Sequence, residues 1–97
     1  MTHFLLRAAA TWSLPGLGVL VLPAGPTPHL ADYPLHTALQ VEVAPPEAAR
    51  YTATATVEET THGGGFGGPT RALLLNITGA ERLPPGTNIW LAAPAAL

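Results

Sequence analysis

The sequence predicts an all-β protein, either a small barrel or a sandwich. Two segments, residues 36–44 and 51–59, alternate apolar and polar side chains with a period of two. That alternation is typical of a strand with one buried face. The chain holds 11 prolines and 10 glycines that separate short segments, and no stretch shows a sustained period of 3.6 residues. Several short strands between frequent turns indicate an all-β fold.

The first expected strand lies within residues 4–18 and runs into the turn Pro15-Gly16-Leu17-Gly18. Proline presets φ at one turn position, and glycine tolerates a positive φ. A second strand is expected at residues 19–22, where a continuously apolar run indicates a strand covered on both faces, as in a barrel packed against a partner. Residues 23–34 carry four prolines, so we expect a stiff, extended loop there.

The two alternating segments form the next pair of strands, joined by a turn at residues 44–49 that contains Pro45-Pro46. His36 is expected to begin the first of them. Their apolar faces, which we expect to be buried, hold Thr37, Leu39, Val41 and Val43 in the first and Tyr51, Ala53, Ala55 and Val57 in the second. Threonines on the opposite face of the second segment also favour a strand, because β-branched side chains suit a pleated surface.

The rest of the chain predicts two more strands. Residues 62–69 are nearly all glycine and form an expected flexible loop, which a continuously apolar strand at residues 72–75 follows. Residues 79–82 have room for one helical turn before Pro84. A last strand is expected at residues 87–92, with a frayed tail at 93–97. A length of 97 residues predicts one domain, and no internal repeat is apparent.

The opening segment resembles the start of the second domain of translation elongation factor Tu and related translation GTPases. That domain begins with a Phe-Leu-Leu strand, passes an aromatic-Ser-Ile/Leu step and turns at Pro-Gly-Arg-Gly. The matching residues, without a gap, are Phe4-Leu5-Leu6, Trp12-Ser13-Leu14 and Pro15-Gly16-Leu17-Gly18. The closing half follows the family's order as well. An apolar strand lies at residues 72–77 and a polar helical turn at 79–83, and Gly86 then precedes the last strand at 89–91.

This resemblance covers most of the chain, although the middle matches only by strand order. It implies a six-stranded closed barrel of the translation-factor domain 2 type. Three polar features of the family are replaced in this chain. Ala9-Ala10 stands in place of the acidic pair in the family's first strand, and Leu17 in place of the arginine in its glycine turn. Leu22-Pro23 stands in place of the Thr-Gly that continues its second strand. The phosphate-binding Gly-x-x-x-x-Gly-Lys-Ser/Thr loop is not in the sequence, so we expect neither GTP hydrolysis nor the family's tRNA-end recognition.

The composition narrows the class of partner. Hydrophobic residues make up 47% and charged residues 10% of the chain, against about 25% charged in ordinary soluble domains. So few charges indicate an apolar surface covered by a protein partner or by a second copy of the chain. The net charge is −2 and the four basic residues are scattered arginines, which disfavours nucleic-acid binding.

The chain holds no cysteine, so disulfides and thiolate chemistry are excluded. No run approaches the roughly 20 apolar residues that span a bilayer. The apolar stretch after Arg7 could be mistaken for a signal peptide, but Pro15, Gly16 and Gly18 interrupt it. We therefore expect a cytoplasmic, bacterial protein rather than a secreted one.

Few side chains suggest chemistry. The four histidines lack ligand spacing and acidic companions, so we expect no metal site. Glu58 and Glu59 are adjacent, and neighbours on a strand point to opposite faces, which disfavours a carboxylate pair for acid–base catalysis. The glycine loop lacks lysine and a following helix, so it is a poor phosphate site. The remaining candidate is a partner contact formed by His62, Phe66 and Arg71.

We therefore expect a non-enzymatic β-barrel, without a cofactor, that binds a protein partner or a second copy of itself. Two alternatives remain open. One is an accessory module of translation that docks on a ribosome, a factor or tRNA through the barrel face that the family uses. The other is a small-ligand binder at the barrel mouth, which requires a cavity lined by few polar groups.

Overall fold

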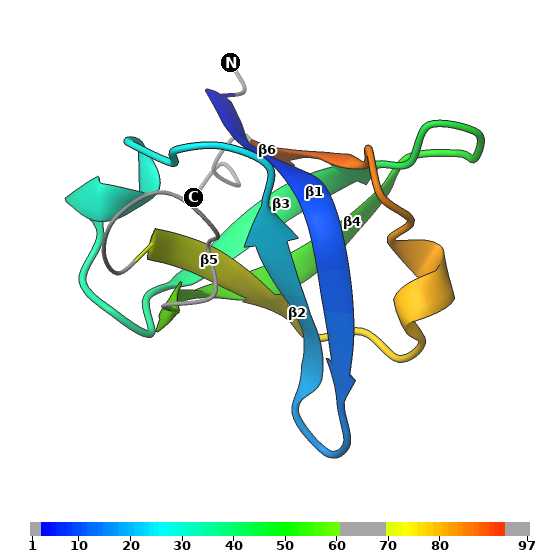
Figure 1. The fold of residues 1–97 in the computed structure, drawn as a ribbon, viewed down its shortest axis with the longest axis horizontal. Helices are drawn as coiled ribbons and strands as arrows, with labels where there is room; N and C mark the ends of the chain where they lie inside the picture. Colours follow the sequence, from blue (N-terminus) through cyan, green and yellow to red (C-terminus); the bar gives the residue numbers. More distant parts are fainter. Residues whose placement is uncertain (1–2, 61–69, 93–97) are drawn as a thin grey trace, which may run out of the picture.

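The computed structural model describes residues 3–60 and 70–92, which form a closed six-stranded antiparallel β-barrel (Figure 1). This confirms the expected all-β class and the closed barrel with six strands. The strands follow one another around the barrel in the order β1-β2-β5-β4-β3-β6, and β6 pairs with β1. Their bounds are β1 (His3–Leu14), β2 (Gly18–Pro23), β3 (Ala38–Ala44), β4 (Tyr51–Thr60), β5 (Thr70–Leu75) and β6 (Asn88–Leu91).

Strand β1 is long enough to pair with two neighbouring strands. Its first half pairs with β6 and its second half with β2, with a register shift between Phe4 and Leu6 on one side and between Ala8 and Ala10 on the other. A bulge of this kind lets two consecutive side chains face the same way. Leu5 and Leu6 are accordingly both buried, which explains why this strand opens on an unbroken apolar run.

The alternation of β3 and β4 is confirmed where the two strands pair. Leu39, Val41 and Val43 are buried on β3, and Ala55 and Val57 on β4. Strand β3 begins at Ala38, so the expectation that His36 begins it is wrong. His36 has a positive φ of 70°, a conformation that belongs to a turn and not to a strand.

The proline-rich segment 23–34 is not fully extended, contrary to our expectation. It contains a 3-10 turn, η1 (Leu30–Asp32), in which the amides of Leu30 and Ala31 donate to the carbonyls of Thr27 and Pro28. Proline suits this turn because its fixed φ, near −65°, is also a helical value. The turn places Leu30 fully inside the core.

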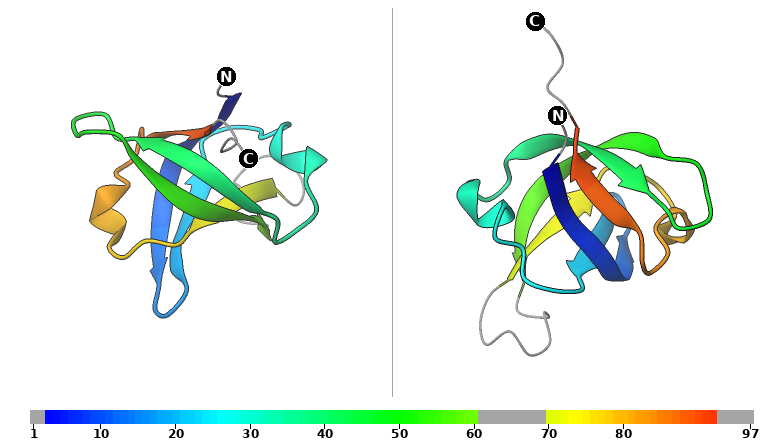
Figure 2. Two further views of the ribbon diagram at one scale, coloured as in Figure 1. Left: turned by 180° about the vertical axis from the view of Figure 1, so that it is seen from behind. Right: turned by 90° about the horizontal axis from the view of Figure 1, so that it is seen from above.

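A second 3-10 turn, η2 (Ala80–Arg82), occupies the place where the sequence predicts one helical turn. Leu83, which follows it, is also fully buried. Figures 1 and 2 show η1 and η2 on opposite sides of the molecule, so Leu30 and Leu83 enter the core from opposite sides.

The Pro-Gly-x-Gly turn joins β1 and β2 as expected. The amide of Leu17 donates to the carbonyl of Leu14 at 2.9 Å, and Gly16 and Gly18 both have positive φ. Gly18 also lies against β5, where a Cβ atom would clash with the carbonyl oxygen of Leu75. Glycine is therefore required here both for conformation and for space.

The chain contains a structural repeat that the sequence does not reveal. Each 3-10 turn is followed by a four-residue turn of the form Pro-x-x-Thr that leads directly into a strand: residues 34–37 into β3 and residues 84–87 into β6. We name these the first and the second lead-in turn. In each, the amide and the hydroxyl of the threonine both donate to the carbonyl of the proline. The third residue has a positive φ in both, 70° at His36 and 90° at Gly86.

The two lead-in turns also bind their neighbouring strands alike. The amide of His36 donates to Val57 of β4, and the amide of Val57 donates to the carbonyl of Thr37. In the second turn, Gly86 donates to Ala8 of β1, and Ala8 donates to Thr87. The strand order around the barrel has the same symmetry. If β3 is exchanged with β6, β4 with β1 and β5 with β2, every strand keeps neighbours of the same kind. The barrel is thus built from two similar three-strand units.

Candidate functional site

The site predicted from the sequence is only partly within the described residues. His62 and Phe66 lie outside them. Arg71 lies on β5, where its Nε is 3.9 Å from a carboxylate oxygen of Glu59 on the paired strand β4. Its Nη1 atom is buried and has no hydrogen-bond partner among residues 3–60 and 70–92. The prediction that these three residues contact a partner together is therefore untested.

The acidic and histidine side chains that the structure describes do not gather into a metal site: over residues 3–60 and 70–92, no group of three or more His, Cys, Asp or Glu could hold an ion. Glu58 accepts hydrogen bonds from Thr56 and His36, whereas Glu59 approaches Arg71. The two neighbouring carboxylates thus have different partners, as expected for consecutive residues of a strand.

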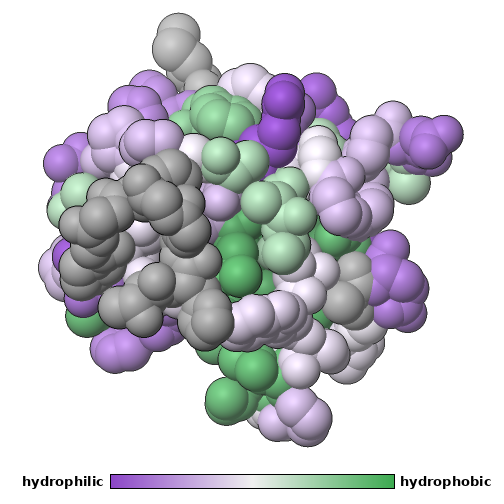
Figure 3. All heavy atoms as spheres, in the orientation of Figure 1, coloured by the Kyte–Doolittle hydropathy of each residue, from purple (hydrophilic) through white to green (hydrophobic). Residues whose placement is uncertain are grey.

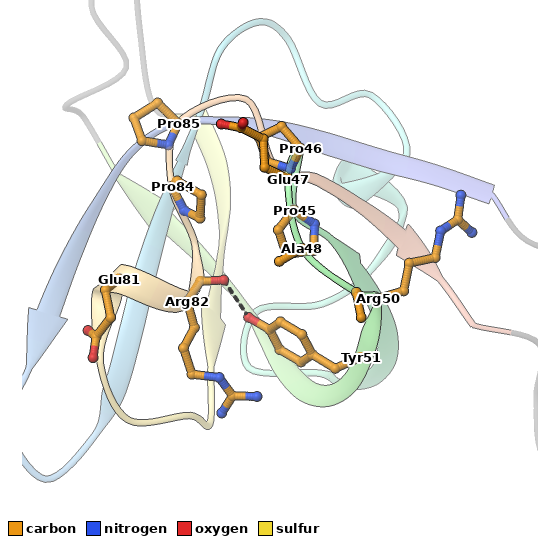
Figure 4. Close-up of a pocket in the computed structure, with 11 residues that line it drawn as sticks. Pro45, Pro46, Glu47, Ala48, Arg50, Tyr51, Glu81, Arg82, Pro84 and Pro85 are labelled. Atoms are coloured by element: carbon orange, nitrogen blue, oxygen red, sulfur yellow. Dashed lines mark hydrogen bonds between the residues drawn. The ribbon is translucent and has the colours of Figure 1, made fainter.

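A cleft of about 690 Å³ lies between the turn from β3 to β4 and the segment that follows η2 (Figure 4). We name it the proline cleft. One wall comes from residues 45–51 and the other from residues within 81–85, so each wall carries a pair of adjacent prolines. Figure 4 shows the prolines toward one end of the cleft, with Tyr51 and Arg82 toward the other.

Tyr51 and Arg82 make two contacts with each other. The hydroxyl of Tyr51 donates to the backbone carbonyl of Arg82 at 2.9 Å, and the Arg82 guanidinium lies 4.4 Å from the centre of the Tyr51 ring. A guanidinium over an aromatic face is attracted by the ring's quadrupole. Burial raises the pKa of Tyr51 above its ordinary value of 10.0, and the positive charge of Arg82 opposes that rise.

A second candidate surface is the outer side of β1, β2 and β5. Trp12, Leu20 and Leu74 occupy paired register positions on the three strands, which puts their side chains on one face. Trp12 is 43% exposed and Leu17, at the turn, is 64% exposed, while Leu20 and Leu74 are half-buried. We name these four residues the outer apolar face. Figure 3 shows hydrophobic residues over β2 and the β1–β2 hairpin.

The outer apolar face bears on one expectation. The apolar runs of β2 and β5 indicate strands covered on both faces, as in a barrel packed against a partner. Within the chain, inward residues such as Val21 and Leu73 are fully buried, whereas the outward Leu20 and Leu74 are half-buried, so cover by a partner stays a prediction. A hollow of about 290 Å³, between residues 13–18 and 76–79, lies next to the hairpin. The outward leucines therefore continue an apolar surface that the barrel itself does not cover.

Sequence reasoning did not find the proline cleft. In the sequence, Pro45-Pro46 indicates a turn and Pro84 ends a helical turn, and neither points to a binding site by itself. The strand order brings their two loops together, because β3 pairs with both β4 and β6. The signal in the sequence is that each of two loops has two adjacent prolines close to Tyr51 or Arg82. It indicates a cleft only once the strand order shows that the two loops lie together.

Comparisons with family models, curated proteins and solved structures found no match to this chain. None of the helical segments in the described part of the chain is long and apolar enough to cross a membrane.

Proposed function

We propose that this protein is a non-enzymatic β-barrel module that binds another protein. The outer apolar face carries the proposal. An exposed tryptophan and an exposed leucine are joined there to two half-buried leucines, on a chain with only 10% charged residues. Contiguous apolar surface with an exposed aromatic residue is typical of protein interfaces.

The physical gain comes from covering this face. Trp12 and Leu17 stand out from the barrel surface, so a partner that encloses them removes apolar area from water at about 25 cal/mol per Å². Large aromatic side chains dominate binding energy at such interfaces. The hollow beside the hairpin adds a concave surface next to this convex one.

The test combines sedimentation velocity over a range of concentrations with affinity capture from native lysate. We expect the wild-type protein to self-associate or to capture a discrete protein in stoichiometric amount. The double variant Leu17→Ser, Leu20→Ser should abolish that association. Leu35→Ser is the matched control, because Leu35 is 42% exposed but lies within the first lead-in turn, away from the outer apolar face.

Three outcomes contradict the proposal. A wild-type protein that stays monomeric and captures no protein lacks the proposed activity. Equal loss of association in the Leu35→Ser control would show that the outer apolar face is not the contact. Capture of ribosomal proteins or tRNA by the wild type would favour the translation alternative, which the resemblance to the second domain of elongation factor Tu suggests.

A further inference from the structure

Arg82 differs from the other described arginines in having no side-chain partner that accepts its protons. Over residues 3–60 and 70–92, Arg7 donates to the Asn88 side chain, Arg50 pairs with Glu42 at 2.8 Å, and Arg71 approaches Glu59. The Arg82 guanidinium instead lies over the ring of Tyr51. A contact with the ring uses the charge of the guanidinium and leaves N–H donors that a ligand can bind.

The same tyrosine holds Arg82 at both ends. Its hydroxyl binds the Arg82 carbonyl, and its ring lies against the guanidinium. A side chain fixed in this way before binding loses less conformational entropy when a ligand arrives. Arg82 is thus a positioned cation at one end of the proline cleft.

The rest of the cleft favours an apolar group. Its walls carry four prolines and two alanines, and prolines have no backbone N–H to donate. The carbonyl of Pro84 already accepts both the amide and the hydroxyl of Thr87. A volume of about 690 Å³ falls within the roughly 300–1,000 Å³ of ordinary small-molecule sites.

The charges around the cleft favour a ligand with a single negative charge. The lining holds two arginines and two glutamates, and Arg50 is already paired with Glu42. Glu81 is turned away from Tyr51, and its carboxylate lies over Gly79 (Figure 4). Arg82 is therefore the one cation of the described lining that is not already paired, and with Glu47 and Glu81 in the same lining a group with one negative charge suits the site better than a doubly charged phosphate.

We propose that the proline cleft binds a small organic monocarboxylate with an apolar body, whose carboxylate is held by Arg82. The carboxylate accepts the edge N–H groups of the guanidinium, and the apolar body packs along the proline rings. This site is separate from the outer apolar face, so it stands whether or not that face binds a protein.

The test is a titration of ¹⁵N-labelled protein with phenylacetate and with hexanoate, followed by NMR. We expect saturable shifts confined to residues 45–51 and 81–86. The neutral isosteres phenylacetamide and hexanamide should bind about tenfold more weakly or worse, because they lack the charge that strengthens the hydrogen bonds. Equal binding of acids and amides, or no saturable shift with either acid, would overturn the proposal.

Two matched variants locate the contact. Arg82→Gln keeps the backbone carbonyl that Tyr51 binds, and should weaken binding of both acids about tenfold or more. Arg50→Gln removes an arginine from the same cleft that is already paired, and should change affinity by less than about twofold. Both side chains are exposed, and thermal melts check that both variants stay folded. Equal effects of the two substitutions would contradict the role of Arg82.

A peptide arm identifies the source of the carboxylate. Acetyl-Leu-Pro-Leu with a free C-terminus carries the same group as the small acids, and its amide is the control. Binding of the small acids with shifts in the cleft supports the proposal whether or not the peptide binds. Binding of the free-acid peptide alone overturns the assignment to a small molecule and assigns the cleft to a protein C-terminus.

Discussion

The two lead-in turns share one backbone design and differ in their surroundings. Residues 34–37 and 84–87 make the same hydrogen bonds within the turn and to the adjacent strand. Yet Thr87 is fully buried whereas Thr37 is half-buried, and the third position is histidine in one and glycine in the other. The same local geometry is thus achieved with different residues, and burial determines how much each contact stabilises the barrel.

The residues just before the turns differ in the same direction. Leu83 precedes the second turn and is fully buried, while Tyr33 precedes the first and is only partly buried against the core. The proline cleft is also built on the second turn, from Pro84 and Pro85. The second unit therefore combines tighter packing with the candidate ligand site. Three pairs of substitutions test that contrast, and a fourth pair tests the contact at the cleft.

The largest expected effect is at the core side of the second turn. Leu83→Ala should lower the free energy of unfolding by about 2–5 kcal/mol, because it leaves a cavity around a fully buried leucine. Tyr33→Leu, at the matching position, should cost less than about 1.5 kcal/mol, since it keeps an apolar side chain there. Urea denaturation measures both. Similar losses would contradict the difference in packing.

The third turn position should respond with opposite signs. Gly86→Ala should destabilise by about 1–2 kcal/mol, because a φ of 90° is strained for a residue with a Cβ atom. His36→Gly should stabilise by up to about 1 kcal/mol, since it relieves the same strain. The side chain of His36 is 74% exposed, so its hydrogen bond with Glu58 offsets little of that gain. Loss of stability in His36→Gly would contradict the strain argument.

The two threonine hydroxyls make bonds of similar length, 2.7 Å at Thr37 and 2.6 Å at Thr87. Thr87→Val should lower the free energy of unfolding by about 1–1.5 kcal/mol, because the lost bond is buried. Thr37→Val should cost less than about 0.5 kcal/mol, since water replaces the hydroxyl. Thermal melts of the two variants, recorded side by side, check this order.

The smallest expected effect concerns the bond between Tyr51 and the carbonyl of Arg82. The pKa of Tyr51 is raised in the folded protein, so its contribution to stability is complete below about pH 10 and is lost as the pH rises through the folded value. Tyr51→Phe should remove that alkaline loss. Arg82→Gln should raise the pKa of Tyr51 further, because the positive charge opposes the rise. Absorbance titration of tyrosinate measures the shift, and an unchanged or lowered pKa would contradict it.

The strands were predictable because the alternation of apolar and polar residues along each segment indicates which side chains are buried. Period-two alternation gave the inward faces of β3 and β4, and the Pro-Gly-x-Gly turn gave the β1–β2 hairpin. The 3-10 turn at Leu30 was missed, because prolines suit both an extended loop and a helical turn. Only the surrounding core, which accepts Leu30, decides between the two.

The candidate sites were harder to predict, since they depend on which segments the barrel brings together. The outer apolar face requires the register of Trp12, Leu20 and Leu74 on three strands that are not consecutive in sequence. The proline cleft requires the loop that joins β3 to β4 and the loop that leads into β6. These loops come together because β4 and β6 both pair with β3. The relation of the fold to the second domain of elongation factor Tu remains a prediction from residues at the two ends of the chain.

Closure of the barrel has a consequence for recognition. Because β6 pairs with β1, the ring of six strands has no terminal strand whose backbone groups await a partner. The backbone open to a partner's strand lies in overhangs, such as residues 11–14 of β1, which pair with β2 and not with β6. Selectivity therefore depends mainly on side chains on the barrel's exterior and in its loops, so it can change by substitution there while the hydrogen-bonded ring stays as it is.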